Sequence, residues 1–347
     1  MGERPLIGIT MGDPAGIGPE ILARALARED LHGKARMLVL GDAGVMRRAV
    51  SLAGTGMEIH PVGDPKAALF HRGAMDVVDV GAQGLADLPY GRVSAAAGMA
   101  AYACIHTAIA LAMDHRIDAT VTGPINKESL RLAGCPHAGH TEIFGHLTGT
   151  DRYGMMLVHG PLRVVHVSTH CSLREACERV RRQRVLETIR LADEACRSMG
   201  IESPRIAVAG LNPHAGENGL FGTEEREEIL PAVEDARQAG LSVEGPLPAD
   251  TLFSKVQGGL FDVAVAMYHD QGHIPLKMAG FRWDAAKGGW QSVSGVNITL
   301  GLPIIRCSVD HGTAFDVAGK GIATEESLAA AIEAAVHMVH ASTRATP

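Results

Sequence analysis

The chain has 347 residues, 46% of them apolar, and a net charge of −7. This apolar content, with 20% charged residues, is typical of a globular protein and not of a disordered chain. Charged residues of both signs are interspersed, which leaves no basic stripe for nucleic acid. No apolar run reaches the ~18 residues of a membrane span, and the amino terminus lacks a signal-peptide pattern. We expect a globular protein of one large or two moderate domains.

The six cysteines form no CxxC pair and no disulfide-like framework. This pattern indicates reduced thiols, the usual state in a cytosolic protein. Aromatic residues are only 4% of the chain, and 41 residues are glycine. The composition therefore predicts a soluble cytoplasmic protein in which closely packed helices cover a sheet with many glycine turns.

Strand-like and helix-like segments alternate along the chain. The expected strands lie at residues 6–10, 37–40 and 119–122. The expected helices begin near residue 19 and cover residues 94–113, 174–199, 224–239 and 325–341. This order predicts an α/β protein with a mostly parallel, doubly wound sheet. Since no linker is obvious, two domains would have to share strands or exchange the chain more than once.

Three further apolar runs, at residues 163–170, 205–214 and 262–269, each end on a histidine. Each is typical of a short buried strand that breaks into a polar turn. Ligands of open α/β sheets bind beyond the carboxyl ends of the strands. Imidazole is the commonest metal ligand, and three histidines with an open fourth position form a known catalytic arrangement. The pattern predicts a metal site of His170, His214 and His269.

Several other segments offer groups that bind anions. The loop GDPAGIGPE at residues 12–20 permits a tight turn before a helix, and its spacing does not match the GxGxxG fingerprint. A structural turn and a ligand-contacting loop both remain open for it. His140 and Thr141 are adjacent donors suited to a phosphate or a carboxylate. Arg306 follows an apolar run, so it needs an acidic partner or a ligand.

Residues 268–277 hold the densest group of reactive side chains. Asp270 can orient a metal ligand or take a proton. Lys277 can bind an anion or act as a general base. The small residues at 310–323 would let a flat ligand approach the backbone closely.

Together these segments closely resemble the 4-hydroxythreonine-4-phosphate dehydrogenase family, from ITMGDPAGIGPE at residues 9–20 to Gly321. The HGTA…AGKGIA stretch at residues 311–323 also looks like the adenine-side loop of isopropylmalate and isocitrate dehydrogenases. The resemblance implies their two-domain α/β/α fold, with a mostly parallel sheet and a cleft between the domains. We expect residues 1–123 plus 262–347 to form the first domain, with the cofactor loop. Residues 124–261 would form the second, with metal ligands and dimer contacts.

The resemblance also implies a homodimer whose active site lies at the subunit interface. One divalent metal per subunit (Zn, Mg, Co or Mn) would be held by the matching His170, His214 and His269, with ligands from both subunits. The implied substrate contacts are His140, Thr141, Lys277, Asn297 and Arg306. Lys277 or Asp270 would be the catalytic base. NAD, or alternatively NADP, would accept the hydride. The expected cofactor contacts are Asp250, His311, Gly312, Thr313, Ala314 and Asp316.

Two departures bear on the substrate. Residues 278–296 are longer than in the vitamin B6 enzymes of the family, and residues 169–173 are THCSL where those have THLPL. Both features resemble the branch that oxidises 4-phospho-D-threonate or 4-phospho-D-erythronate. The expected reaction is oxidation at C3 followed by decarboxylation to dihydroxyacetone phosphate. Three alternatives remain: 4-hydroxy-L-threonine 4-phosphate dehydrogenase of pyridoxal phosphate biosynthesis, a phosphate-handling acyltransferase of the same fold, and a non-catalytic binding module.

Overall fold

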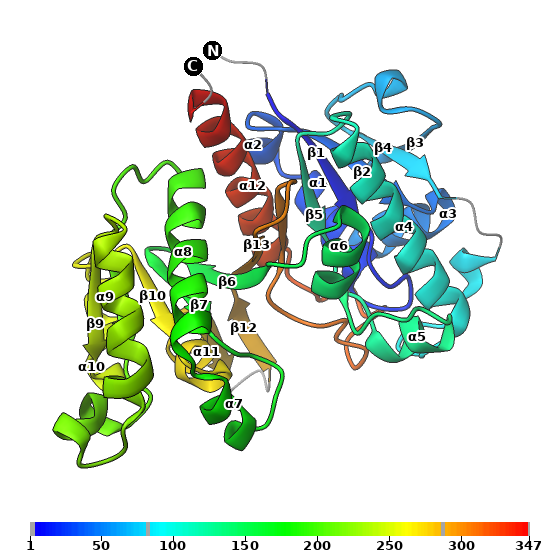
Figure 1. Ribbon diagram of the computed structural model, residues 1–347. Helices are drawn as coiled ribbons and strands as arrows, with labels where there is room; N and C mark the ends of the chain where they lie inside the picture. The colour runs from blue at the N-terminus through cyan, green and yellow to red at the C-terminus, as the bar shows by residue number, and fades with distance from the viewer. Residues whose placement is uncertain (1–3, 81–83, 286–288, 346–347) are drawn as a thin grey trace. The chain divides into compact units, whose positions relative to one another are not determined.

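The computed structural model describes the backbone of residues 4–80, 84–285 and 289–345 (Figure 1). Within it the chain forms two compact units. Unit 1 comprises Met1–Arg152, Ser292–Val296 and Leu302–His340, and unit 2 comprises Tyr153–Gln291, Asn297–Gly301 and Ala341–Pro347. The chain therefore passes between the units more than once. The domain boundaries expected near residues 123 and 261 stay a prediction.

Unit 1 is built on strands in the order β3-β4-β2-β1-β5-β14. Their bounds are Leu6–Thr10 (β1), Arg36–Gly41 (β2), Glu58–Val62 (β3), Ala74–Asp79 (β4), Ala119–Thr122 (β5) and Arg306–Val309 (β14). All neighbouring pairs run parallel. The central strands are buried along their whole length, as expected for parallel strands covered on both faces.

The helices of unit 1 follow the strands in alternation. They are α1 (Gly18–Leu26), α2 (Glu29–His32), α3 (Ala43–Ala53), α4 (Ala95–Met113), α5 (Lys127–Leu132), α6 (His140–Thr148) and α12 (Glu326–Ala345, which ends in unit 2), with 3-10 turns at Pro65–Ala67 and Leu85–Asp87. Helix α4 begins where the Ser94 side chain accepts a hydrogen bond from Ala97 N, and it packs on β1, β2 and β5. By length and composition α4 could cross a membrane. However, 56% of that window is buried, as in the core helix of a soluble protein.

Unit 2 has the strand order β13-β6-β7-β10-β8-β9. The bounds are Gly154–His159 (β6), Leu162–His166 (β7), Ile206–Ala209 (β8), Val243–Leu247 (β9), Val263–Ala266 (β10) and Val296–Leu300 (β13). Strands β6 and β7 are antiparallel, whereas β7, β10, β8 and β9 are parallel. The predicted α/β class with a mostly parallel sheet is confirmed in both units.

Helices cover both faces of the unit 2 strands. They are α7 (Leu173–Arg179), α8 (Arg182–Ser198), α9 (Leu230–Gln238), α10 (Ala249–Gln257) and α11 (His269–Gly280), with a left-handed turn within Pro213–Gly219 and a π-helix at Glu225–Ile229. Helices α10 and α11 pack on one face, in a core that includes Val164, Ala207 and Ala264. Helix α8 contacts the same strands but contributes nothing to that core, so it covers the other face.

Two predicted helices differ from the structure. The continuous helix expected at residues 174–199 is wrong, because the chain breaks between α7 and α8. Glu228 Oε2 accepts a hydrogen bond from Arg182 N at 2.7 Å and so satisfies the new helix start. The helix expected at residues 224–239 begins instead as the π-helix. Strands β11 (Phe281–Asp284) and β12 (Gly289–Val293) form a separate sheet within the long 278–296 segment, of which residues 286–288 lie outside the described residues.

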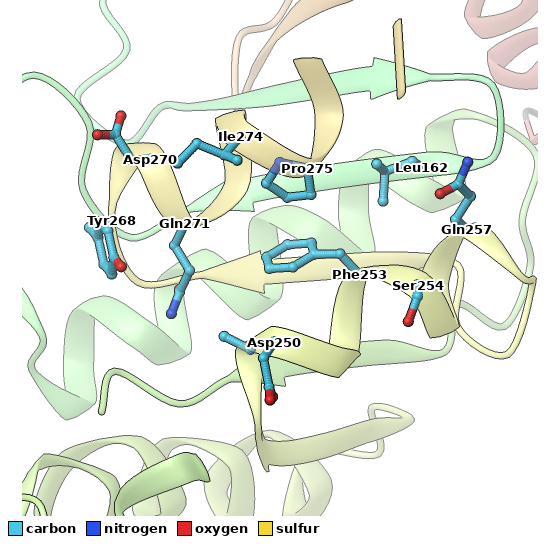
Figure 2. Close-up of a pocket in the computed structure, with 11 residues that line it drawn as sticks. Leu162, Asp250, Phe253, Ser254, Gln257, Tyr268, Asp270, Gln271, Ile274 and Pro275 are labelled. Carbon is cyan, nitrogen blue, oxygen red and sulfur yellow. The ribbon is translucent and has the colours of Figure 1, made fainter. Parts of the chain in front are cut away.

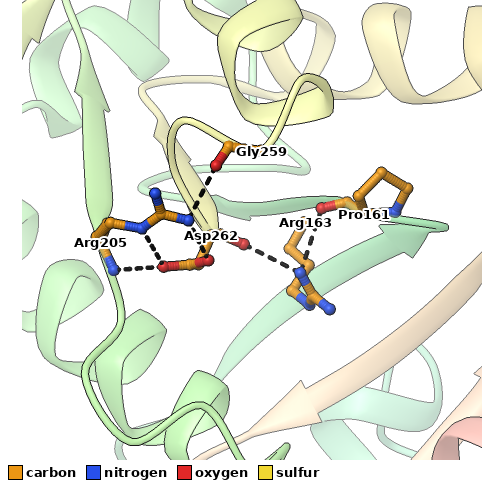
Figure 3. A network of polar contacts seen from close by, with 5 residues as sticks. All are labelled: Pro161, Arg163, Arg205, Gly259 and Asp262. Atoms are coloured by element: carbon orange, nitrogen blue, oxygen red, sulfur yellow. Dashed lines mark hydrogen bonds and ion pairs between the residues drawn. The ribbon is translucent and has the colours of Figure 1, made fainter.

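A polar network joins the amino ends of β7, β8 and β10 (Figure 3). The Asp262 carboxylate accepts hydrogen bonds from Arg205 N, Nε and Nη2 at 2.8, 3.0 and 2.9 Å. Arg163 Nη1 donates to the Asp262 carbonyl at 3.3 Å and to the Pro161 carbonyl at 3.2 Å. Arg205 holds the pKa of the Asp262 carboxyl below its usual range. The network ties the starts of all three strands together.

Candidate functional site

The three strands that precede the predicted metal ligands are neighbours. Strand β10 pairs in parallel with β7 on one side and with β8 on the other, so their carboxyl ends share one edge of unit 2. His170 lies four residues after β7, His214 five after β8 and His269 three after β10. The structure therefore has the strand arrangement that a shared site needs.

His269 is the first residue of α11 and is held by two neighbours. Its Nδ1 lies 2.6 Å from Asp270 Oδ1. Its ring stacks on the His273 ring, with centroids 3.6 Å apart and an interplanar angle of 11°. The His170 ring lies 6.1 Å from the His269 ring. A carboxylate and a stacked ring thus fix the plane of His269, and a second predicted ligand lies beside it.

His214 begins a left-handed turn. Residues 214–218 all have positive φ, between 46° and 83°, although only Gly216 among them is a glycine. A left-handed helical residue other than glycine costs roughly 1–2 kcal/mol, and such strain gathers at functional sites. His214 Nδ1 lies 2.7 Å from Glu217 Oε1, and 60% of the His214 side chain is exposed. The turn thus presents His214 to solvent with a carboxylate partner.

Gln271 connects the loops that carry His214 and His269. Its Oε1 accepts a hydrogen bond from Met267 N at 2.7 Å, and its Nε2 donates to the Gly210 carbonyl at 2.8 Å. Met267 directly follows β10, and Gly210 directly follows β8. The amide therefore fixes the distance between the starts of the two loops.

The chemistry of these side chains fits a divalent cation. An ionised carboxylate only accepts hydrogen bonds, so Glu217 and Asp270 select the tautomers in which Nδ1 of His214 and His269 carries the proton. Each Nε2 then keeps its lone pair for a metal, as in known carboxylate–histidine–metal arrangements. Among the described residues, however, no three His, Cys, Asp or Glu side chains gather closely enough to hold an ion. The metal set, with ligands from two subunits, stays a prediction.

Unit 1 contains a buried cation among the predicted substrate contacts. Arg306, the first residue of β14, is 2% exposed, and burial lowers the pKa of its guanidinium to about 10. Its Nη2 donates to Thr122 Oγ1 at 2.7 Å, and the guanidinium lies 5.4 Å from the centre of the Phe144 ring. The sequence called for an acidic partner or a ligand here. Thr122 supplies a neutral hydroxyl, and the charge of the Glu142 carboxylate also acts on the guanidinium.

His140 opens α6, the helix that also contains Phe144. Its Nε2 is buried and makes no hydrogen bond to a described residue. Burial, helped by the charges of Arg306 and Lys127, lowers the pKa of His140 well below its usual value. A neutral imidazole with an unused nitrogen, close to a buried guanidinium and followed by Thr141, is suited to an anionic ligand.

The other two predicted substrate contacts lie in unit 2. Lys277 Nζ is 4.3 Å from the centre of the Phe281 ring. Asn297 Nδ2 lies 2.9 Å from Met155 Sδ, while Asn297 Oδ1 is buried without a hydrogen bond to a described residue. The grouping of these two residues with His140, Thr141 and Arg306 around one ligand stays a prediction.

The predicted cofactor loop packs against the loop at residues 12–20. The Thr313 carbonyl accepts a hydrogen bond from Ile17 N at 3.1 Å, and a Cβ on Gly16 would lie 3.0 Å from Thr313 Cβ. Residues 12–20 are buried throughout, which favours the structural turn over a ligand-contacting loop. The loop of residues 311–316 keeps open space beside Gly312. Its contact with a nucleotide stays a prediction.

Asp250, also a predicted cofactor contact, belongs to unit 2 and lines a cavity of about 470 Å³ (Figure 2). One wall comes from α10 and the other from Tyr268 and the first turns of α11. Asp250 and Asp270 lie on opposite walls, and Phe253, Ile274 and Pro275 add apolar surface. The cavity thus adjoins the His269 loop.

The sequence did not single out Glu217, Gln271, His273 or Glu225, although each contacts a histidine loop. Glu217 and Gln271 follow His214 and His269 by three and two residues, so proximity in sequence was an available signal. His273 is one helical turn beyond His269 and stacks on it. Glu225 is recognised only in three dimensions, because its role depends on the backbone path of residues 210–218.

Comparisons with known proteins identify the family of this chain. The model of the family described as "Pyridoxal phosphate biosynthetic protein PdxA" matches residues 33–335. A protein of Cupriavidus necator named D-threonate 4-phosphate dehydrogenase is 49% identical, over 94% of this chain and 95% of its own length. A protein of Desulforapulum autotrophicum named 4-hydroxythreonine-4-phosphate dehydrogenase is 48% identical, over 96% of this chain and 95% of its own.

A solved structure gives the same result. The 4-hydroxythreonine-4-phosphate dehydrogenase of Klebsiella pneumoniae is 45% identical and superposes with a TM-score of 0.87, covering 97% of this chain and 99% of that one. Sequence and fold therefore agree over nearly the whole length, and this chain belongs to the PdxA family of pyridoxal phosphate biosynthetic proteins.

Proposed function

We propose that this protein oxidises the C3 hydroxyl of a 4-phosphorylated hydroxy acid and then decarboxylates the resulting β-keto acid. The substrate is 4-phospho-D-threonate or 4-phospho-D-erythronate, and the product is dihydroxyacetone phosphate. The observation that carries this proposal is the near-full-length similarity to a D-threonate 4-phosphate dehydrogenase. A second candidate substrate, 4-hydroxy-L-threonine 4-phosphate, is favoured by the similar identity to a dehydrogenase named for it.

His170, His214 and His269 would hold one divalent cation, with Zn, Mg, Co and Mn as candidates. The loop of residues 311–316 and Asp250 would contact NAD, with NADP as the alternative. When bound, the cation would supply stabilisation of developing negative charge, and the nicotinamide would supply a hydride acceptor. The carboxylates of Glu217 and Asp270 support this assignment, because they leave the Nε2 lone pairs of His214 and His269 available to a metal.

The chain's own groups would hold and deprotonate the substrate. Arg306 supplies a buried positive charge, and His140 and Thr141 supply hydrogen-bonding groups, for the phosphate or the carboxylate. Asn297 offers an amide whose oxygen is otherwise unused. A substrate held at both ends presents its C3 hydrogen in one direction, and such orientation lowers the activation free energy by several kcal/mol.

Lys277 is the proposed general base for the C3 hydroxyl. Asp270 is the alternative base, but its Oδ1 lies 2.6 Å from His269 Nδ1, which fits an orienting role better. A carboxylate that orients a ligand changes the metal affinity, whereas a base changes kcat. The two roles of Asp270 can therefore be separated by measurement.

We further propose that the active enzyme is a cytoplasmic homodimer with its active site at the subunit interface. Within the described residues one chain does not bring three ligand-type side chains together, so a partner chain would complete the set. All six cysteines are free thiols, as expected in a reducing compartment. Light scattering coupled to gel filtration should give the mass of two chains, and a monomer that is fully active would overturn this part.

The central test is NADH formation at 340 nm with each of the three phosphorylated acids, before and after metal removal. We expect the D-threonate and D-erythronate phosphates to react faster than hydroxythreonine phosphate, and we expect metal-stripped protein to be inactive. His214→Ala should abolish NADH formation, while His106→Ala, at an exposed position on α4, should not change it. Full activity without metal would overturn the metal role.

The same assay separates the remaining classes. No reduction of NAD or NADP with any of the three acids would overturn the dehydrogenase proposal in favour of an acyltransferase or a binding module. Faster turnover of hydroxythreonine phosphate would select the second candidate substrate.

A further inference from the structure

The left-handed turn that carries His214 has a buried carboxylate behind it. Glu225 is 6% exposed and lies in the π-helix that follows the turn. Its Oε1 accepts hydrogen bonds from Leu211 N at 2.8 Å and Asn212 N at 2.7 Å. Its Oε2 accepts one from Asn212 Nδ2 at 2.9 Å. One carboxylate therefore satisfies three donors on the chain that leads into His214.

The same carboxylate packs directly against the turn. A Cβ on Gly216 would lie 2.8 Å from Glu225 Oε2. A Cβ on Gly210 would lie 2.8 Å from the Ala215 Cα and 3.2 Å from Glu225 Oε1. Glycines at positions 210 and 216 thus let the strand end, the turn and the Glu225 carboxylate come into contact. The turn has little room to adopt another conformation while Glu225 is in place.

We propose that Glu225 is a positioning residue that keeps residues 214–218 left-handed and so presents Nε2 of His214 to the metal. This inference rests on the proposed metal role of His214. Glu225 touches neither the imidazole nor any reacting atom, so it acts through the backbone of the turn. A neutral side chain of the same shape should not replace it.

The substitution Glu225→Gln shows why the charge is needed. If the oxygen of the introduced amide accepted from the two backbone N–H groups, its nitrogen would face Asn212 Nδ2, which is itself a donor. Asn212 cannot simply turn around, because its Nδ2 also donates to Glu224 Oε2 at 2.8 Å. The opposite orientation of the amide would place its NH₂ group against Leu211 N and Asn212 N. Either orientation leaves donors facing donors.

The test measures Zn²⁺ affinity of the metal-stripped, full-length protein by competition with a chromophoric chelator. Glu225→Gln should weaken binding by about 10- to 100-fold, the usual effect of losing an outer-sphere partner. Glu228→Gln is the matched control, because Glu228 lies in the same π-helix but contacts Arg181 and Arg182 instead of the turn. It should change the affinity less than two-fold.

His214→Ala separates the two levels of the proposal. If His214→Ala retains wild-type affinity, the metal role of His214 is wrong. If His214→Ala loses the metal while Glu225→Gln binds like wild type, the metal role stands and the positioning role of Glu225 is wrong. Should Glu225→Gln fail to fold, Asn212→Ala takes its place. That variant removes the side-chain bond to Oε2, and we expect a several-fold loss, with wild-type affinity overturning the inference.

A second-site change distinguishes positioning from general destabilisation. Glycine adopts positive φ without the steric cost of a Cβ, so Ala215→Gly favours the left-handed turn. The double variant Ala215→Gly/Glu225→Gln should regain part of the lost Zn²⁺ affinity. No recovery would show that Glu225 does not act through the turn conformation and would overturn the inference.

Discussion

At the amino ends of β7, β8 and β10, charged groups neutralise one another. At the carboxyl ends of the same strands, the histidine side chains are partly exposed, and their conformations are fixed by backbone strain or by a carboxylate partner. Arg205 and Asp262 share three hydrogen bonds at the amino edge (Figure 3). At the carboxyl edge, His214 lies in a left-handed turn and His269 is held by Asp270.

From this difference we infer that the amino ends of these strands stabilise the fold and that their carboxyl ends bind the ligands. Backbone strain lowers stability, so it persists where it has a use. Open α/β sheets bind ligands at the carboxyl ends of their strands. We therefore expect substitutions at the carboxyl edge to change metal binding and activity, and substitutions at the amino edge to change stability.

The largest effect should come from His269→Ala. Loss of a proposed metal ligand should reduce NADH formation by at least about 1,000-fold, because the C3 oxygen loses its charge stabilisation. The melting temperature of the metal-free protein should change little, since 39% of the His269 side chain is exposed. Assay rates and melting curves of the same preparation check both parts. A large fall in melting temperature with activity retained would show that His269 serves stability and not metal binding.

Asp270→Asn should have the next largest effect. Asparagine weakens the hold on His269 Nδ1, so metal affinity should fall by about 10- to 100-fold. Competition with a chelator measures the affinity, and Glu178→Gln, at an exposed position on α7, is the control. A fall in kcat with unchanged metal affinity would instead identify Asp270 as the general base.

The sequence predicted the three strands that end at this edge, but not their order or the backbone conformation of the segments that follow them. Buried runs such as VAVA at residues 263–266 indicate a strand by composition alone. The strand order β7-β10-β8, which makes the three histidine loops neighbours, was not predicted, because the rule for parallel sheets gives only a shared edge at the carboxyl ends. The break between α7 and α8 was missed, because the Glu228 carboxylate that satisfies Arg182 N comes from a distant part of the chain.

The left-handed turn shows the same limit at the site. Local preference would place His214, Ala215 and Glu217 in right-handed or extended conformations. Tertiary contacts with Glu225 and the close packing at Gly210 override that preference. The position of His214 just beyond the carboxyl end of a strand was therefore predictable from the sequence, whereas the left-handed conformation of its turn was not.

Asp262→Asn tests the amino edge. The substitution removes the charge that accepts three hydrogen bonds from Arg205, so the free energy of unfolding should fall by about 1–2 kcal/mol. The value stays modest because 49% of the Arg205 side chain is exposed to solvent. Urea denaturation measures it, with Asp30→Asn, in an exposed pair with Arg28, as a control expected below about 0.5 kcal/mol. The kcat should not change, and a ten-fold loss would contradict the division between the two edges.

The smallest effect at neutral pH is expected for His166, which ends β7 inside the core. The side chain is 2% exposed, neither ring nitrogen makes a hydrogen bond to a described residue, and burial lowers its pKa from 6.5 to about 3. Between these values the unfolded chain binds a proton that the folded chain does not. The neutral ring's contribution to stability is therefore complete above pH 6.5 and is lost as the pH falls toward 3.

His166→Leu removes that titration. Relative to wild type, the variant's free energy of unfolding should be nearly unchanged at pH 7 and should improve as the pH falls, by on the order of 1 kcal/mol or more at pH 5. Urea titrations of metal-free protein at both pH values measure the difference. A constant difference across this range would show that the ring takes up its proton equally in the folded and the unfolded chain, and it would contradict the lowered pKa of His166.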